Sequence, residues 1–150
     1  MLERFQQFSF IISGINRHIQ RLERTEMIKY GYKGSYAQYL VAIQRFKDGV
    51  TCTQLSEICD KDKAAVSRII VEMENRDLVF RESDNERLYN AKIKLTDEGK
   101  KAARYVSERA CSAVDAVGTT MTDDERTALY SALDIIFSKL DTLNKEGIPH

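Results

Sequence analysis

The chain has 150 residues, of which 31% are charged and 43% apolar, and its 23 basic side chains balance 23 acidic ones. Zero net charge excludes a generally basic nucleic-acid binder, so any affinity for DNA must come from the local placement of Lys and Arg. The length suits one compact domain, or one domain with a helical extension. Pro149 is the only proline, so the body of the chain lacks the main helix breaker, which favours a mostly helical fold.

Composition also bounds the compartment and the chemistry. No apolar run approaches the roughly 18 residues of a membrane span, and the first residues lack the layout of a signal peptide, so we expect a cytoplasmic protein with no membrane partner. Cys52, Cys59 and Cys111 are an odd, scattered set, which favours reduced thiols over disulfides or zinc and leaves a redox switch open. No phosphate loop, nucleophile elbow or metal-spaced cluster is present, so we expect no enzyme activity, no cofactor and no metal.

The first predicted helix covers residues 3–29. Its apolar positions repeat in alternating steps of three and four residues, a period of 3.5 that is typical of a seam packed on a partner helix, although an ordinary amphipathic helix on its own core gives a similar pattern. The seam consists of Phe5, Phe8, Ile12, Ile15, Ile19 and Leu22.

Shorter elements follow. A second helix is predicted over 35–47, opened by a capping box at Ser35 and ended by Gly49. A third helix over 51–59 opens with a capping box at Thr51, and a fourth covers 63–76. Two short strands, 78–83 and 91–95, flank a polar turn at 84–87.

The last two helices complete the pattern. Thr96 caps a long fifth helix that reaches about residue 118, and a capping box at Thr122 opens the last helix, 123–144. The last helix again has apolar positions in steps of four and three, which are Leu129, Leu133, Ile136, Leu140 and Leu143. Matching seams at the two ends of the chain indicate one apolar layer that links the chain ends.

Residues 51–70 have the pattern of a helix-turn-helix. Two short helices that cross steeply need apolar or small residues where they touch, and Leu55, Ile58 and Val66 are among those that supply them. Asp60 falls at the turn, where a positive φ is common and Asp is better tolerated than most residues. Asp62 is placed to cap the second helix of the pair, which in this motif lies in the major groove.

Four strings of residues then resemble the multiple-antibiotic-resistance regulator (MarR) family of bacterial transcription factors. They are Leu55-Ser56, DKAAVSR at 62–68, ENRDLV at 74–79 and LTDEG at 95–99. The last string matches the family's Leu-Thr-x-x-Gly, whereas Asp77 stands where the family usually has Gly. Arg87 and Tyr89 occupy the positions of the family's usual wing Asp and Arg, and Ala64 and Ala65 replace residues that are often hydroxylic.

The resemblance covers nearly the whole chain and implies a mainly α fold with a small β-hairpin wing. It implies a dimerisation helix at 1–34, a winged helix-turn-helix domain at 35–95 and C-terminal helices at 96–150 that complete the dimerisation region. It further implies a homodimer that binds a pseudo-palindromic operator in double-stranded DNA, usually as a repressor, with release by a small aromatic or phenolic effector. The altered wing, the Ala pair and the neutral lobe favour an alternative, a winged-helix protein-interaction module that has lost specific DNA binding.

The helix-turn-helix pattern and the family resemblance together give the candidate DNA contacts. Arg68 is the best base reader, because Arg bonds guanine bidentately, although a surface salt bridge to Glu72 is the plain alternative. Thr53 and Gln54 lie at a helix start, where they either contact phosphate or only cap the helix. The full predicted set is Thr53, Gln54, Lys63, Ala64, Ala65, Ser67, Arg68, Arg87 and Lys92.

An effector pocket is expected near the junction of the first two helices, where aromatic hydroxyls would suit a phenolic ligand. Core and interface packing is the alternative explanation for the same residues. The predicted pocket residues are Arg17, His18, Tyr30, Tyr36 and Tyr39.

Overall fold

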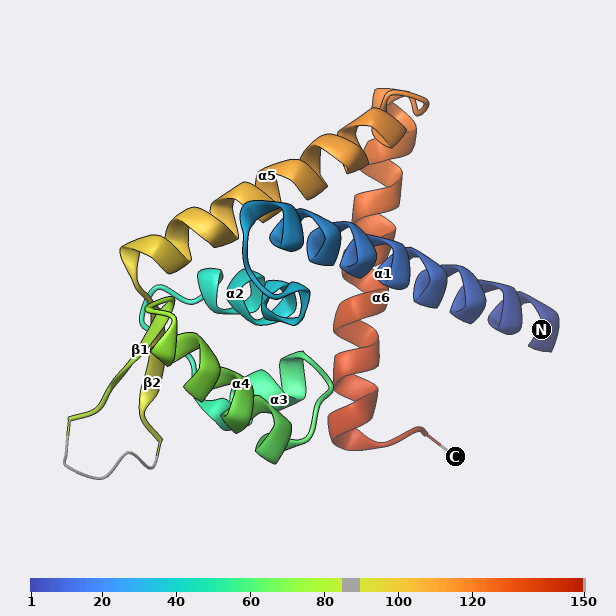
Figure 1. The fold of residues 1–150 in the computed structure, drawn as a ribbon. Helices are drawn as coiled ribbons and strands as arrows, with labels where there is room; N and C mark the ends of the chain where they lie inside the picture. The colour runs from blue at the N-terminus through green and yellow to red at the C-terminus, as the bar shows by residue number, and fades with distance from the viewer. Residues whose placement is uncertain (85–89, 150) are drawn as a thin grey trace. The chain divides into compact units, whose positions relative to one another are not determined.

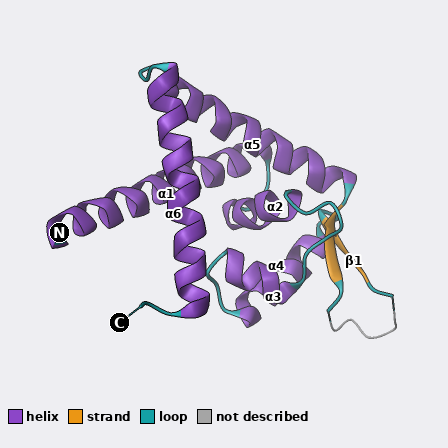
Figure 2. Ribbon diagram, turned by 180° about the vertical axis from the view of Figure 1, so that it is seen from behind, coloured by secondary structure: helices purple, strands orange, loops and turns teal. Residues whose placement is uncertain are grey.

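The computed structural model describes residues 1–84 and 90–149, and it is mainly helical with one two-stranded antiparallel hairpin (Figures 1 and 2). This confirms the predicted fold class. The elements in order are α1 (Leu2–Tyr30), the short 3-10 helix η1 (Gly34–Tyr36), α2 (Ala37–Gln44), α3 (Cys52–Ile58), α4 (Lys63–Asn75), β1 (Val79–Glu82), β2 (Lys92–Leu95), α5 (Asp97–Gly118) and α6 (Asp123–Glu146).

The chain divides into two compact units, residues 1–111 and 112–150. The first unit holds the hydrophobic core, in which α2, α3, α4, the hairpin and the first half of α5 meet (Figure 1). Its fully buried side chains include Leu40, Leu55, Ile70, Met73 and Ile93. The predicted helix-turn-helix is therefore part of a packed domain rather than an isolated pair of helices.

The hairpin has a regular antiparallel register in which Phe80 pairs with Lys94 and Arg81 with Ile93. Because side chains alternate along a strand, these two pairs lie on opposite faces of the hairpin. Val50, just before α3, forms a further bridge to Ile93, with N–O distances of 3.1 and 2.8 Å. The base of the hairpin is thus tied directly to the start of the helix-turn-helix.

The junction between α4, β1 and α5 is built by backbone geometry. Asp77 has a φ of 57°, in the left-handed region where Gly is the easiest residue. Thr96 Oγ1 donates to the carbonyl of Asp77 at 2.6 Å and accepts from the N–H of Gly99 at 3.0 Å, as expected of a helix cap. A Cβ on Gly99 would lie 1.9 Å from the carbonyl oxygen of Leu78, so only glycine fits there.

The predicted seams on α1 and α6 are poorly covered in the single chain. On α1, Glu26 and Met27 are buried, while large apolar residues nearer the N-terminus are exposed. On α6 no residue is buried among those that the structure describes. The exposed apolar residues of the two helices include Phe5, Phe8, Ile12, Ile15, Leu22, Leu129 and Leu140.

Three local predictions are wrong. The second helix ends at Gln44 rather than near Lys47, because a turn intervenes before Gly49. Ser35 forms no capping box: a 3-10 turn occupies this position, and the Ser35 hydroxyl is buried with no partner among the described residues. Ile58, expected on the apolar face of α3, is 48% exposed.

Along the described part of the chain, no helix has the length and apolar character needed to cross a membrane.

Candidate nucleic-acid interface

The first helix of the motif, α3, is fixed by its own first turn. Thr51 Oγ1 accepts from the N–H of Gln54 at 3.1 Å, and Gln54 Oε1 accepts from the N–H of Thr51 at 3.0 Å, so the predicted capping box is confirmed. The side-chain oxygen of Gln54 is therefore used within the capping box. Only the N–H groups of its side-chain amide remain for an outside partner. Thr53 is exposed, and its side-chain hydroxyl has no hydrogen-bond partner among the described residues.

The turn into α4 follows the predicted chemistry. Asp60 has a φ of 50°, and Asp62 Oδ1 accepts from the N–H groups of Ala64 at 2.7 Å and Ala65 at 3.3 Å. The carboxylate thus satisfies two of the free N–H groups at the start of α4. Those amides are not free to bind phosphate, so contacts from this end of α4 must come from side chains.

The inner and outer faces of α4 are sharply different. Val66, Ile70 and Met73 are fully buried, which fixes the rotation of the helix about its axis. The predicted contact residues then fall on the other side: Lys63, Ala64 and Arg68 are exposed, and Ala65 and Ser67 are half-buried. Val71 is 46% exposed on the same helix.

The side chain of Arg68 forms no hydrogen bond or ion pair within the described residues. The expected alternative, a salt bridge to Glu72 one turn further on, is absent, and Glu72 instead bonds two residues of the segment after α1. Glu72 Oε2 accepts from Lys33 Nζ and from the Tyr36 hydroxyl, each at 3.1 Å, and these bonds hold the pKa of Glu72 below its usual range. The guanidinium of Arg68 is therefore available to an external acceptor.

Three of the predicted residues share a small hollow between α3, α4 and the hairpin. Thr53, Lys63 and Ser67 line this hollow of about 150 Å³, together with Arg81. Arg81 also forms an ion pair with Glu74 of α4, which fastens the hairpin to that helix. Arg81 is absent from the predicted set of DNA contacts, because nothing in the local sequence pattern shows that strand alternation turns it toward α4.

Cys52 lines the same hollow. Burial raises the pKa of its thiol, an effect that the nearby positive charges of Arg81 and Lys63 oppose. Burial likewise raises the pKa of the Cys59 thiol. A raised pKa favours the thiol over the reactive thiolate, which agrees with structural rather than redox roles for these two residues.

The wing residues divide into two groups. Lys92 is exposed and pairs across the hairpin with Glu82, which forms an ion pair with Lys94 at 3.0 Å. Arg87, the predicted minor-groove residue, and Tyr89 lie outside the described residues. The structure therefore assigns the strands of the wing and leaves the prediction for Arg87 as it stood.

The predicted effector residues are not gathered around one cavity. Tyr36 and Tyr39 are only 5% and 3% exposed and belong to the core, whereas Arg17 and His18 are exposed on α1. Tyr30 is half-buried. None of the five lines the 150 Å³ hollow or the larger one of about 860 Å³ described below.

Tyr30 instead belongs to an aromatic cluster that joins α1 to α5 and α4. Its ring lies 4.9 Å from that of Tyr105 and 5.9 Å from that of Tyr32, centroid to centroid. The guanidinium of Arg76, at the end of α4, lies 5.4 Å from the centroid of Tyr32, within the range of a cation–π contact. The connection after α1 thus touches α4 at Glu72 and again one turn later at Arg76.

Glu26 anchors the same region from α1. It is a buried carboxylate that accepts from Lys29 Nζ at 2.7 Å and from Tyr105 Oη and Arg109 Nε at 3.3 Å. The bond from Lys29, with a further contribution from Arg109, holds the pKa of Glu26 below its usual range against the opposing effect of burial. These hydrogen bonds of Glu26 join α1 to α5. They thereby fix the helix from which the connection that contacts α4 begins.

Comparisons with known proteins find one family in both sequence and fold. The MarR family model matches residues 30–87, which run from the end of α1 to the wing. A comparison with curated proteins found no match. A MarR transcriptional regulator from Methanosarcina mazei Go1 has a similar structure, with a TM-score of 0.78 and 22% identity over 92% of this chain and 99% of that one.

Several of the similar structures contain DNA. A protein of the same type from Listeria monocytogenes, complexed with a 26mer DNA, has a TM-score of 0.74 and 19% identity over 93% of this chain and 94% of that one. The S. aureus MepR–DNA complex has a TM-score of 0.69 and 16% identity over 89% of this chain and 97% of the other. Fold and helix-turn-helix together define a winged helix-turn-helix protein. Over the matched residues and in its fold, the chain is similar to the MarR family, which confirms the resemblance found in the sequence.

Proposed function

We propose that the chain is a transcriptional regulator, most simply a repressor, that binds a pseudo-palindromic operator as a homodimer in the cytoplasm. In each protomer α4 lies in the major groove of double-stranded DNA and Arg68 reads a guanine. Lys63, Thr53 and Ser67 contact the backbone beside it. The observation that carries the proposal is the outer face of α4, where Arg68 is exposed and unpaired among the described residues while the opposite face is anchored in the core.

The proposed dimer rests on the apolar residues that the single chain leaves exposed on α1 and α6. Phe5, Phe8 and Ile15 on α1 and Leu129 and Leu140 on α6 are large side chains at the spacing of a helix–helix seam. Leaving such a surface in water is unfavourable by roughly 25 cal/mol per Å². A second copy of the chain covers it and places a second α4 about one turn of duplex away.

Release of DNA by a small aromatic or phenolic effector is the regulatory part of the proposal. The neighbouring, mutually tilted rings of Tyr30, Tyr32 and Tyr105 offer aromatic surface beside the connection that contacts α4. A ligand that stacks on them would act on α4 through Tyr32 and Arg76. Such a mechanism requires that the ligand bind more tightly when α4 is in one of two positions than when it is in the other.

A second candidate function is a protein-interaction module that keeps the fold without specific DNA binding. Val71 favours it, because this apolar side chain is 46% exposed on α4 and offers DNA only a methyl contact. Zero net charge points the same way.

The salt dependence of the affinity for DNA distinguishes the two functions. Genomic fragments that bind the chain are selected and sequenced, and the affinity for the best fragment is measured from about 50 to about 200 mM salt. A DNA-binding dimer with several phosphate contacts loses roughly 10³-fold in affinity or more over this range. Binding that is absent or flat in salt would support the interaction module.

The variant Arg68→Ala tests the residue that carries the proposal. Its affinity for the selected fragment is expected to fall by about 1–3 kcal/mol, with the dimer intact by sedimentation. Lys139→Ala, which removes one positive charge from an exposed position of α6, is the control and is expected to bind like the wild type. Equal affinities for the two variants would remove Arg68 from the site.

A further inference from the structure

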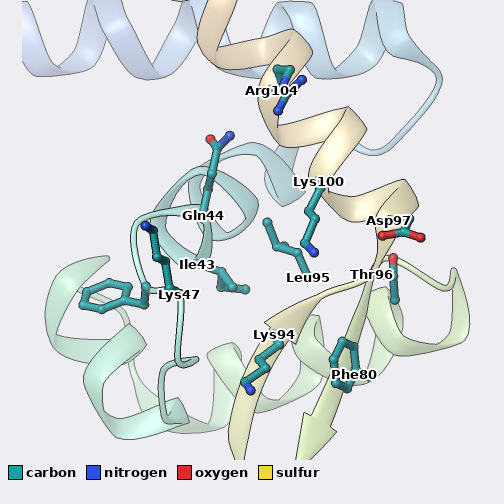
Figure 3. Close-up of a pocket in the computed structure, with 11 residues that line it drawn as sticks. Ile43, Gln44, Lys47, Phe80, Lys94, Leu95, Thr96, Asp97, Lys100 and Arg104 are labelled. Carbon is teal, nitrogen blue, oxygen red and sulfur yellow. The ribbon is translucent and has the colours of Figure 1, made fainter.

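A hollow of about 860 Å³ lies between the end of α2, the hairpin and the first turns of α5 (Figure 3). No part of the proposed function uses it. Its lining residues are Ile43, Gln44, Phe46, Lys47, Phe80, Lys94, Leu95, Thr96, Asp97, Lys100 and Arg104.

This hollow is separate from the candidate DNA surface. Phe80 and its cross-strand partner Lys94 line it, whereas the neighbouring pair, Arg81 and Ile93, lines the small hollow next to α4. Strand alternation therefore puts the two hollows on opposite faces of the hairpin. A ligand in the large hollow does not occupy the outer face of α4.

Positive charge is concentrated here in an otherwise neutral chain. Four cationic side chains line the hollow, against one carboxylate, that of Asp97. Lys94 is paired with Glu82, but the side chains of Lys47, Lys100 and Arg104 have no hydrogen bond or ion pair within residues 1–84 and 90–149. Lys100 and Arg104 are also four residues apart on α5, where two like charges destabilise a helix slightly. A bound anion would relieve this repulsion.

Part of the lining of the hollow is apolar. Ile43 and Leu95 are buried beneath it, and Figure 3 shows Lys100 extending from α5 toward Leu95. Phe46 and Phe80 also line it and are 38% and 42% exposed, so their rings have free faces. The volume lies in the range of sites that hold a small organic molecule, roughly 300–1,000 Å³. Cations over an apolar floor suit an anion with an apolar or flat body.

We propose that this hollow is a binding site for an organic phosphate. A phosphate monoester carries about 1.5 to 2 negative charges at pH 7 and three strong acceptor oxygens. Lys47, Lys100 and Arg104 supply matching donors, whereas a monocarboxylate would leave most of the positive charge uncompensated. The flat part of the ligand lies against Phe46 and Phe80. This site goes beyond the proposed function and does not depend on DNA binding.

The test is calorimetric titration of the full chain with adenosine diphosphate, adenosine and inorganic phosphate, each without DNA. Saturable binding of the diphosphate, at least about tenfold tighter than that of either part alone, is expected because charge and ring contacts act together. The double variant Lys100→Gln/Arg104→Gln should weaken the diphosphate by about tenfold or more. Lys101→Gln/Lys139→Gln removes the same charge from exposed positions outside the hollow and should change it less than about twofold.

A second variant keeps the proposal testable on its apolar side. Phe80→Ala, at a half-exposed ring, should weaken the diphosphate and leave inorganic phosphate unchanged. No saturable binding at millimolar diphosphate, or equal weakening by both double variants, would overturn the site. If Lys100→Gln/Arg104→Gln instead weakens a duplex of unrelated sequence and not the diphosphate, the hollow follows the DNA backbone and the proposal also fails.

Discussion

The Tyr36 hydroxyl donates a hydrogen bond to Glu72 Oε2 at 3.1 Å, and this bond joins η1 to α4 across 36 residues of sequence. Lys33 Nζ reaches the same oxygen at 3.1 Å. Glu72 lies one turn after Arg68 on α4, so the connection that follows α1 sets the position of the helix that carries the proposed base reader. A change in α1 or in its connection can therefore reach the proposed DNA surface through Tyr36 and Glu72.

Tyr36→Phe is expected to destabilise the chain by about 1 kcal/mol, because it removes this hydrogen bond and leaves the buried ring in place. Urea denaturation at neutral pH measures the effect. Tyr30→Phe, at a tyrosine whose hydroxyl has no partner among the described residues, is the matched control and should be close to wild type. Equal stabilities for the two variants would show that the Tyr36–Glu72 bond contributes nothing.

Gly99→Ala tests the close approach of α5 to the backbone of Leu78, just before β1. An added Cβ would lie 1.9 Å from the carbonyl oxygen of Leu78, so backbone must move, and we expect a loss of about 1–3 kcal/mol or more. The same substitution at Gly118, where the nearest atom would be 3.9 Å away, should be neutral or raise stability by up to about 1 kcal/mol. Thermal melts of both variants measure these changes in stability. A Gly99→Ala protein as stable as wild type would contradict the close contact between Gly99 and Leu78.

Asp77→Gly is expected to stabilise the chain by about 1 kcal/mol. Asp77 has a φ of 57°, which costs an L-residue roughly 1–2 kcal/mol and glycine very little, although the freer unfolded chain offsets part of the gain. Denaturant midpoints measure this change. Asp84→Gly, at a position without a positive φ, should give no gain, and a destabilised Asp77→Gly would mean that the Asp side chain makes an unrecognised contribution.

Glu26 predicts a specific dependence of stability on pH. Its pKa in the folded chain is lowered, chiefly by the bond from Lys29, relative to an ordinary value of 4.5. A carboxyl with a depressed folded pKa stabilises the protein fully above its unfolded pKa, and that contribution is lost as the pH falls through the folded pKa. Glu26→Gln should therefore be less stable than wild type at pH 7, with a difference that shrinks below about pH 4.5. A difference that stays constant with pH would contradict this role.

Local chemistry explains what the sequence alone predicts well. The capping boxes at Thr51 and Thr122, the Asp62 cap and the left-handed turn at Asp60 each involve neighbours within a few residues, and the structure contains all four. The apolar face of α4 was predictable for the same reason, since a 3.6-residue period is local. These features are sufficient to place the helix-turn-helix.

The features that sequence reasoning missed depend on distant partners. No local pattern shows that Glu72 bonds Tyr36 rather than Arg68, or that Lys47 from one segment and Lys100 and Arg104 from another surround one hollow. Ser35 resembles a helix cap in sequence, yet a 3-10 turn takes its place. Tyr36 and Tyr39 could be assigned to a pocket or to the core only when their burial was known.

The most direct test of the central claim, that two copies of α4 enter successive major grooves, is methylation interference at guanine N7 on the selected operator. We predict two symmetry-related groups of sensitive guanines centred about 10 base pairs apart, of which Arg68→Ala loses at least one guanine in each half. Interference confined to one half-site, or a pattern that Arg68→Ala leaves unchanged, would contradict the account.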